Sequence, residues 1–451
     1  MNIRKLVFWT KNYLFRRNSY NAYREANGFD SLTGEKKSMI EFAKQKKLVE
    51  YAYKHVKFYK EYYDKCGFNP STLETAGDWD KIPVLEKDII RTNPQSLISD
   101  EYSTASLSIT TTGGSTGTPL QVYKMKNVPI EVMGWRAFKW WGIDPSANTG
   151  ILHRRTPVTF LAKLKNRLMW WPTKRAYLNA STICETDIVK FINDIKRQHT
   201  VWLQGYCSSL ECVADYIIAH NIEIDILKMV WSTSSPLSQT VRIKLENAFR
   251  CKVMDQYGCC EMWNVAIQKP NEPYLTICND FVHVDVVRED NTSCAKGEVG
   301  DILITDLNSF GFPLVKYRLG DKSSIAETCA SSADGYPKMN FVKGRITDSI
   351  ILPGNKGRID GAFLTTICDQ HPTHVDSFQI YQKQDYSVSL KLVLKPNISK
   401  EDKVIVSIIN SLRERLGSDV SFTSEVVDSI PGDRGKKRYI ISEVALNQQK
   451  H

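Results

Sequence analysis

Residues 110–119 read TTTGGSTGTP, and they follow a strand-like segment, SLSITTT, at Ser106–Thr112. Gly113, Gly114 and Gly117 permit positive φ angles and a close approach of the backbone. Backbone N–H groups and hydroxyls can therefore converge on one point, which makes a cradle for phosphate oxygens. The string lacks the GxxxxGK[ST] pattern of P-loop NTPases. Taken alone, it fits a phosphate-binding loop and a polar surface turn equally well.

Helix-like and strand-like segments alternate downstream of this loop. The periodicity of apolar residues predicts helices at 188–198, 208–220 and 236–249, and strands at 201–203, 229–231 and 252–254. Such alternation is typical of a mostly parallel sheet with helices on its faces. We therefore predict an α/β fold whose large N-terminal domain holds mostly parallel sheets and flanking helices.

The pattern changes beyond about residue 275, where short β-strands are expected. They are predicted at His283–Arg288, Asp301–Thr305 and Lys322–Glu327. The last hundred residues resemble a compact α+β unit, with a strand at 388–394, a helix at 400–416 and a strand at 420–427. We place the boundary near Gly344, which gives a large domain at 1–343 and a small, mobile α+β domain at 344–451.

Composition excludes several classes of protein. The 451 residues are about three times a ~150-residue domain, and 42% are hydrophobic and 24% charged. These values argue against a disordered, fibrous or membrane-embedded chain. The net charge of +10 suits anionic ligands such as nucleotides, but no nucleic-acid-binding module is recognisable. The 11 irregularly spaced cysteines indicate reduced thiols in a cytoplasmic protein.

The first 19 residues, MNIRKLVFWTKNYLFRRNS, alternate apolar and basic side chains. Lys11 and Arg16 interrupt the apolar stretch and no cleavage site of small residues follows, so a signal peptide is not indicated. No run of ~20 apolar residues occurs that could span a bilayer. Residues 1–19 could form a basic amphipathic helix on the inner face of a membrane, or a helix that packs on the protein itself.

Four further strings follow the loop in a definite order. They are DQYGCCE at 255–261, GEVGDILITDLNSFGFPLVKYRLGD at 297–321, GRITD at 344–348 and PGDRGKKRYIIS at 431–442. Together they resemble the adenylate-forming superfamily of acyl-CoA synthetases, peptide-synthetase adenylation domains and luciferases. Within it, the sequence is most similar to the phenylacetate–CoA ligase-like branch and its CapK-type members, which are associated with capsular polysaccharide biosynthesis. The resemblance covers nearly the whole chain.

The resemblance implies two half-reactions. A carboxylate attacks the α-phosphate of ATP to give an acyl-adenylate and pyrophosphate, and a nucleophile, usually a thiol, then displaces AMP. The residues that match the phosphate loop are Thr111, Thr112, Gly113, Gly114, Ser115, Thr116 and Gly117. The usual lysine of that loop is absent, because Leu120 follows Pro119, and Lys124 is the nearest lysine.

The resemblance also assigns the remaining ATP-binding residues. Ser234, Ser235 and Pro236 match the segment that flanks adenine, and Tyr257 is expected to stack on the base. Glu261 matches the acidic residue associated with Mg²⁺, a cation that prefers oxygen ligands. Asp321 matches the acceptor of both ribose hydroxyls, and Arg345 would add a donor to ribose or phosphate.

The small domain is expected to supply the catalytic lysine. Alignment of RYIIS with the family's ending places Lys436 at that position, and Lys437 is the alternative because the loop is one residue shorter than usual. Such an ammonium bridges the carboxylate and the α-phosphate. The hinge of the domain rotation would lie at Thr347 and Asp348, although Thr347 departs from the family's usual residue.

Substrate and acceptor are less well specified. Tyr206, Cys207 and Ser208 in GYCSSL match the acyl-pocket segment, or belong to the core. The acid is a small-molecule carboxylate, coenzyme A is the expected acceptor, and an amine on a sugar or amino acid is the alternative. A catalytically inactive nucleotide-binding relative is a second alternative. Zinc is not expected, because Cys259, Cys260, Cys278 and His283 lack a recognised ligand spacing. The sequence does not indicate an oligomeric state.

Overall fold

The computed structural model describes most of the chain. The described residues are 3–112, 120–126, 128–153, 156–157, 159–180, 183–234, 236–327, 334–342, 344–345, 350–355, 358–359, 364, 367–368, 371, 373–430 and 439–448. The chain divides into two compact units. Unit 1 comprises Met1–Phe8, Ile143–Asp255 and Lys343–His451, and unit 2 comprises Trp9–Gly142 and Gln256–Val342.

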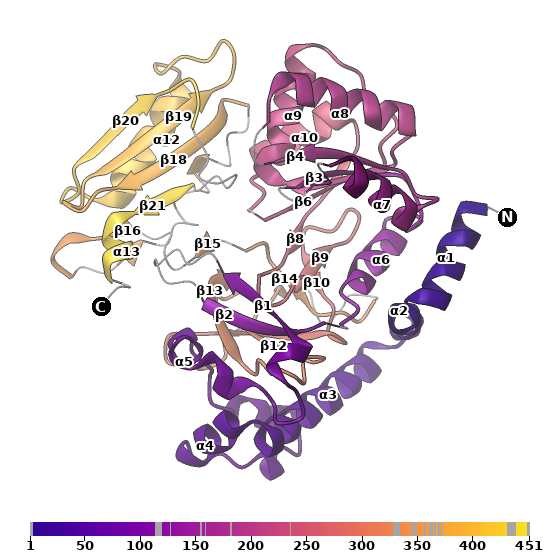
Figure 1. Ribbon diagram of the computed structural model, residues 1–451. Helices are drawn as coiled ribbons and strands as arrows, with labels where there is room; N and C mark the ends of the chain where they lie inside the picture. Colours follow the sequence, from indigo (N-terminus) through magenta and orange to yellow (C-terminus); the bar gives the residue numbers. More distant parts are fainter. Residues whose placement is uncertain are drawn as a thin grey trace. The chain divides into compact units, whose positions relative to one another are not determined.

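Unit 1 contains a five-stranded parallel sheet with the strand order β4-β3-β5-β6-β7. The strands are β3 (Thr149–His153), β4 (Arg175–Asn179), β5 (Trp202–Tyr206), β6 (Met229–Thr233) and β7 (Lys252–Met254). The helices that alternate with them are α7 (Phe160–Trp170), α8 (Glu185–Gln198), α9 (Cys207–Ala219) and α10 (Gln239–Phe249). Figure 1 shows these helices lying against the sheet. The predicted α/β architecture is confirmed.

Local sequence explains where these helices begin and end. Ser238 caps α10 by accepting a hydrogen bond from the Val241 amide, and Thr159 caps α7 in the same way through the Ala162 amide. At the other end, α8 stops at His199 and α10 at Arg250, and both residues adopt left-handed φ angles of 49° and 51°. The apolar faces of α8, α9 and α10 join the inner strands in one core.

The C-terminal part of unit 1 has its own four-stranded sheet, in the order β20-β19-β18-β21. The elements are β18 (Val375–Gln382), β19 (Val388–Leu394), α12 (Lys403–Leu416), β20 (Phe422–Val426), β21 (Ile440–Ser442) and α13 (Glu443–Gln448), preceded by the short hairpin β16 (Ile350–Ile351) and β17 (Arg358–Ile359) and by β15 (Gly344–Arg345). The buried residues of its core all come from between Ile350 and Ile440. The expected strand–helix–strand order is confirmed.

Unit 2 combines helices with antiparallel strands. The helices are α2 (Arg17–Asp30), α3 (Gly34–His55), α4 (Lys57–Lys65), α5 (Lys87–Thr92) and α6 (Glu131–Trp140), while α1 (Ile3–Phe15) begins in unit 1 and ends in unit 2. The strands are β1 (Leu107–Thr112), β2 (Leu120–Met125), β8 (Gln256–Tyr257), β9 (Ala266–Gln268), β10 (Leu275–Ile277), β11 (Val282–Val287), β12 (Gly300–Asp306), β13 (Tyr317–Ser323) and β14 (Lys338–Met339). β1 and β2 form an antiparallel hairpin across the glycine-rich loop (Figure 1).

One predicted strand is wrong in position. The strand expected at Lys322–Glu327 is β13 at Tyr317–Ser323, which pairs with β12. Beyond Ser323 the chain changes its pairing partner, because Ile325 bridges Met339 of β14.

Among the described residues, no helix has the length and apolar character needed to cross a membrane.

Candidate functional site

The YGCCE string forms a tight turn after β8. The Cys259 amide donates to the Met262 carbonyl, and the Met262 amide donates to the Cys259 sulfur at 3.2 Å. Gly258 is required here, because a Cβ atom at this position would lie 2.0 Å from the backbone oxygen of Trp263. The turn therefore fixes the residues on either side of it, Tyr257 and Glu261.

Most of the KYRLGD string, from Tyr317 to Asp321, lies in β13. β13 begins at Tyr317, which is fully buried, and Gly320 adopts a left-handed φ of 76° directly before Asp321. A side chain at Gly320 would be strained in this conformation. The glycine thus sets the direction of the chain at Asp321.

Tyr257 and Asp321 meet directly. The Tyr257 hydroxyl donates to Oδ2 of Asp321 at 2.8 Å. Burial, together with the Asp321 charge, raises the pKa of Tyr257 well above its ordinary value, so the phenol keeps its proton and remains the donor. Two residues assigned by resemblance to the base and the ribose are therefore held together.

Glu261 is buried and bonded to the same strand. Its Oε1 accepts from the Tyr317 hydroxyl at 3.1 Å. Burial and the nearby Glu261 raise the pKa of Tyr317, which keeps this phenol a donor as well. A carboxylate oriented by one hydrogen bond fits Mg²⁺, which takes one or two protein carboxylates together with phosphate oxygens. Mg²⁺ at Glu261 would neutralise charge on the phosphates.

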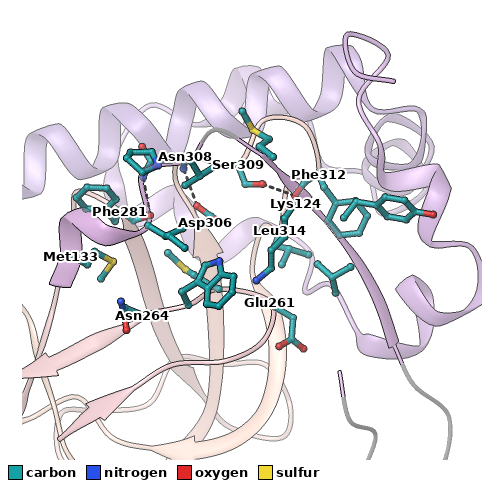
Figure 2. A pocket seen from close by; sticks show the side chains of 18 residues that line it. Lys124, Met133, Glu261, Asn264, Phe281, Asp306, Asn308, Ser309, Phe312 and Leu314 are labelled. Atoms are coloured by element: carbon teal, nitrogen blue, oxygen red, sulfur yellow. Dashed lines mark hydrogen bonds between the residues drawn. The ribbon is translucent and has the colours of Figure 1, made fainter. Parts of the chain in front are cut away.

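A pocket that opens to solvent lies beside Glu261. It is lined by residues of β2, of the turn after β8 and of the segment after β12, including Lys124, Glu261, Trp263, Asn264 and Asp306 (Figure 2). Burial raises the pKa of the Asp306 carboxyl to about 6.

The remaining described candidates lie at one edge of the sheet in unit 1. Tyr206 ends β5 opposite Thr233 of β6, and Ser234 follows with a strained left-handed φ of 79°. The His153 ring at the end of β3 lies 5.0 Å from the Tyr206 ring. The carboxyl ends of parallel strands are the usual place for ligands in such sheets. Cys207 is buried, whereas Ser208 is half-buried and Pro236 is exposed.

Several predicted residues lie outside the described residues. They are Gly113, Gly114, Ser115, Thr116, Gly117, Ser235, Thr347, Asp348, Lys436 and Lys437. For Thr111, Thr112 and Arg345 the structure gives the strand but not the side chain.

The cysteine and histidine candidates have other contacts. His283 bonds Glu41 through Nδ1 at 2.6 Å and Asp285 through Nε2 at 3.0 Å. Cys278 is buried and Cys260 is exposed. In the part of the chain that the structure describes, no group of three or more histidine, cysteine, aspartate or glutamate side chains is arranged to hold a metal ion.

Sequence reasoning missed three members of the site. Tyr317 stands inside the KYRLGD motif, so its position in the motif was a usable signal. No sequence signal marks Asp306 or Trp263, because each becomes a pocket residue only through the pairing of distant strands.

Comparisons with known proteins agree with this architecture. Residues 351–443 match the model of the CapK C-terminal domain. The chain is 23% identical over 404 residues to protein CapK of Staphylococcus aureus, covering 87% of this chain and 86% of that protein. It is 21% identical over 416 residues to the phenylacetate-coenzyme A ligase of Escherichia coli strain K12, covering 86% and 90%. A solved structure of 2-hydroxyisobutyryl-CoA ligase in its postadenylation state matches with a TM-score of 0.70 at 16% identity, covering 91% of each chain.

The chain has the fold of the adenylate-forming ligases. Its sequence is similar over most of its length to protein CapK and to phenylacetate-coenzyme A ligase, and residues 351–443 match the CapK C-terminal domain, in agreement with the resemblance of its motifs.

Proposed function

We propose that this protein is an ATP-dependent ligase that activates a carboxylate as an acyl-adenylate and passes the acyl group to coenzyme A. The observation that carries the proposal is the convergence of Tyr257, Glu261 and Asp321 at strand β13. Asp321 would accept the ribose hydroxyls, and Tyr257 would lie against the base. Glu261 would hold Mg²⁺ on the phosphates, where positive charge favours the transition state.

The loop at Thr111–Gly117, with Ser234–Pro236 and Arg345, would complete the nucleotide site. Tyr206, Cys207 and Ser208 would line part of the acyl pocket. The segment from Gly344 onward would act as a small domain that carries Lys436 and turns about Thr347–Asp348. The hydrophobic core of this segment draws only on residues from Ile350 to Ile440.

The acid would be bound while ATP is attacked, with water excluded, because a free adenylate hydrolyses. Lys436 would bridge the incoming carboxylate and the α-phosphate as a compact charge. Rotation of the small domain would then carry Lys436 away from the site and expose the adenylate to the acceptor.

Carboxylate-dependent exchange of pyrophosphate into ATP tests this proposal without a known acceptor. We expect exchange with at least one member of a panel of small acids, and none without acid. ATP binding without exchange for any acid would instead favour an inactive nucleotide-binding relative. Adding coenzyme A should accelerate AMP release and yield a thioester by mass spectrometry. Acceleration by an amino sugar or amino acid, with an amide product, would replace coenzyme A as acceptor.

Peripheral membrane contact through residues 1–19 is a further part of the proposal. Helix α1 buries Phe8, and Trp9 stacks on Tyr23 with 4.8 Å between ring centroids, so part of the helix packs on the protein. Leu14 and Phe15 remain exposed at its end. Loss of vesicle binding on deletion of residues 1–15 would test this contact.

A further inference from the structure

Lys124 carries a buried amino group without a hydrogen-bond partner. Its Nζ is inaccessible to solvent and forms no hydrogen bond with any described residue. It lies 4.3 Å from the centroid of the Trp263 ring, which supplies a cation–π contact. Figure 2 shows the side chain turned into the pocket, on the side where Glu261 lies. An ammonium left in this state costs free energy unless a ligand supplies an acceptor.

The charges around Lys124 indicate which acceptor fits. Burial lowers the pKa of Lys124, and the neighbouring cysteines, Glu261 and Asp306 oppose that shift. Neither carboxylate forms an ion pair with Lys124. The ammonium therefore has acidic groups nearby, which offset burial only in part, and no hydrogen-bond acceptor. An uncharged oxygen supplies what is lacking, whereas another carboxylate would meet two acidic groups.

The rest of the lining describes the body that would carry this oxygen. Most of the surface is apolar and comes from Val122, Met125, Val128, Met133, Met262, Phe281, Phe312 and Leu314. Asn264 also lines the pocket and is half-buried, so it can contribute a second polar contact. The pocket thus suits an alkyl or aryl group that bears one hydroxyl or carbonyl oxygen.

We propose that this pocket receives the acyl body of the acid, and that Lys124, whose amino group is covered in this structure, shifts to donate a hydrogen bond to a hydroxyl or carbonyl oxygen on that body. The enzyme then selects hydroxy or oxo acids over their unsubstituted parents. This inference rests on the proposed ligase function and names the substrate class of that site. Lys124 thereby contributes to the choice of acid and takes no part in the transfer of the acyl group.

Matched pairs of acids test the subsite. Butyrate is compared with 3-hydroxybutyrate and 3-oxobutyrate, and phenylacetate with its hydroxy derivatives, in pyrophosphate exchange and in calorimetric binding. We expect one oxygenated acid to be preferred about ten- to a hundredfold, the effect of one hydrogen bond to a charged group. Lys124→Met should erase that preference by slowing the oxygenated acid only. Lys126→Met is the matched control, because Lys126 is exposed and bonds Ala105 outside the pocket.

The outcomes separate this inference from the function on which it rests. Equal loss of both acids in Lys124→Met would overturn it, because Lys124 would then serve the shared carboxylate or the nucleotide. A preference that survives Lys124→Met, or no preference across the panel, would also overturn it while exchange itself continues. Absence of exchange with every acid, by contrast, is a failure of the ligase proposal, and calorimetry then decides the subsite alone.

A second inference comes from helix α7 in unit 1, which exposes its apolar side. Phe160 is 79% exposed, Leu161 75% and Leu168 66%, and Leu164 and Trp171 are exposed as well. Phe160, Leu164, Leu168 and Trp171 follow one another at three- and four-residue steps, so they share one face. No residue of this helix is buried.

The other side of α7 faces the protein. The Asn166 amide donates to the Tyr177 hydroxyl at 2.8 Å, and the Arg175 guanidinium lies 3.3 Å from the centre of the Trp170 ring. These contacts hold the helix with its apolar face outward. A row of exposed large apolar residues of this kind marks an interaction surface.

The charges of α7 identify the partner. Lys163, Lys165 and Arg167 lie beside the apolar face, and the helix contains no acidic residue. On a helical projection, Lys165 falls on one edge of that face and Lys163 and Arg167 on the other. Aromatic and leucine side chains flanked by cations are the pattern of a helix that lies in the interface of an anionic bilayer.

We propose that α7 inserts its apolar face into an anionic lipid surface. Sedimentation with phosphatidylglycerol-containing vesicles should retain the full-length protein, and neutral phosphatidylcholine vesicles should retain it at least severalfold less. Leu161→Glu with Leu168→Glu should weaken binding severalfold, with any residual binding due to residues 1–19, and Lys163→Glu with Lys165→Glu should weaken it most at low salt. Val406→Glu, at an exposed valine of α12, is the control. Absence of vesicle binding would overturn the proposal. A dimer in light scattering that depends on α7 would also overturn it, and would identify a second copy of the protein as the partner.

Discussion

The Tyr257 hydroxyl donates to Oδ2 of Asp321 across 2.8 Å, which joins the end of β8 to a residue inside β13. This bond orients the Asp321 carboxylate. A residue that is to hold two ribose hydroxyls must first be prevented from rotating, and Tyr257 supplies that restraint. Because one hydrogen bond joins the two side chains, replacing each of them in turn tests its separate contribution to ATP binding.

Asp321→Ala should weaken ATP binding at least tenfold, because each hydrogen bond to a charged acceptor contributes about 1.5–3 kcal/mol. Calorimetric titration with ATP measures the change, and Asp321→Asn, which keeps one acceptor oxygen, should lose less. Tyr257→Phe is the matched control, since it removes only the orienting hydroxyl and should cost less affinity than Asp321→Ala. Unchanged ATP affinity in Asp321→Ala would refute the ribose assignment.

Glu261→Gln should remove the charge that attracts Mg²⁺ while keeping an acceptor for the Tyr317 hydroxyl. We expect pyrophosphate exchange to fall on the order of 10²-fold, with a higher Mg²⁺ concentration needed for half-maximal rate. Tyr317→Phe leaves the carboxylate in place and should change the Mg²⁺ requirement less. An identical Mg²⁺ requirement in Glu261→Gln and the parent would contradict the metal role.

Lys436→Ala should abolish adenylate formation while ATP still binds, because the resemblance puts most nucleotide contacts in the large domain. Loss of one charge contact in the transition state costs on the order of 10²–10³ in rate. Lys437→Ala is the natural comparison and should remain close to normal. The reverse result, with Lys437→Ala inactive, would shift the assignment by one residue.

The sequence predicted the elements whose apolar pattern is long and regular, such as α8 through α10 and β19. Prediction from the sequence was less successful for elements whose ends depend on pairing with distant parts of the chain. The segment from Gly34 to Lys65 forms two helices, α3 and α4, because Val56 takes extended angles of φ −123° and ψ 107° between them. The strand after Asp321 changes partner at Ile325, and no local pattern signals that change.

The candidate site likewise contains residues that the motifs identify and residues that only the fold brings together. Tyr257, Glu261 and Asp321 could be named in advance because they stand in ordered motifs. The sequence identifies Lys124 only as the lysine nearest to the phosphate loop, and its contact with the Trp263 ring joins residues 139 positions apart. A lone lysine in a strand looks like a solvated residue until its neighbours are known.

Asp306→Asn should stabilise the protein at neutral pH. Burial raises the pKa of this carboxyl to about 6, above its ordinary 3.8, so the folded protein holds the proton more tightly than the unfolded chain. The carboxyl therefore lowers the free energy of unfolding as the pH rises from about 4 to 6, and the cost persists above pH 6. The variant should gain about 1–3 kcal/mol at pH 7.5 in urea unfolding and nothing at pH 4. A gain that is equal at both values would contradict the shift.

His283→Gln should destabilise the protein in a pH-dependent way. His283 lies between Glu41 at 2.6 Å and Asp285 at 3.0 Å, and Trp79 donates to Asp285 at 3.1 Å. Burial opposes the charge of the ring, but the two carboxylates prevail and raise the pKa of His283 from 6.5 to about 10. Because the folded value is the higher one, the contribution is complete below pH 6.5 and is lost as the pH rises through 10.

The difference in free energy of unfolding between parent and His283→Gln should therefore be about 2–4 kcal/mol at pH 6.5 and should shrink toward pH 10. His220→Gln is the control, because that ring is half-exposed on α9 and its change should be small at every pH. Urea unfolding at pH 6.5, 8 and 10 measures both variants. A difference that stays constant over this range would show that the imidazole acts by packing against Trp79 and not by its charge, since only the charge is lost between these pH values.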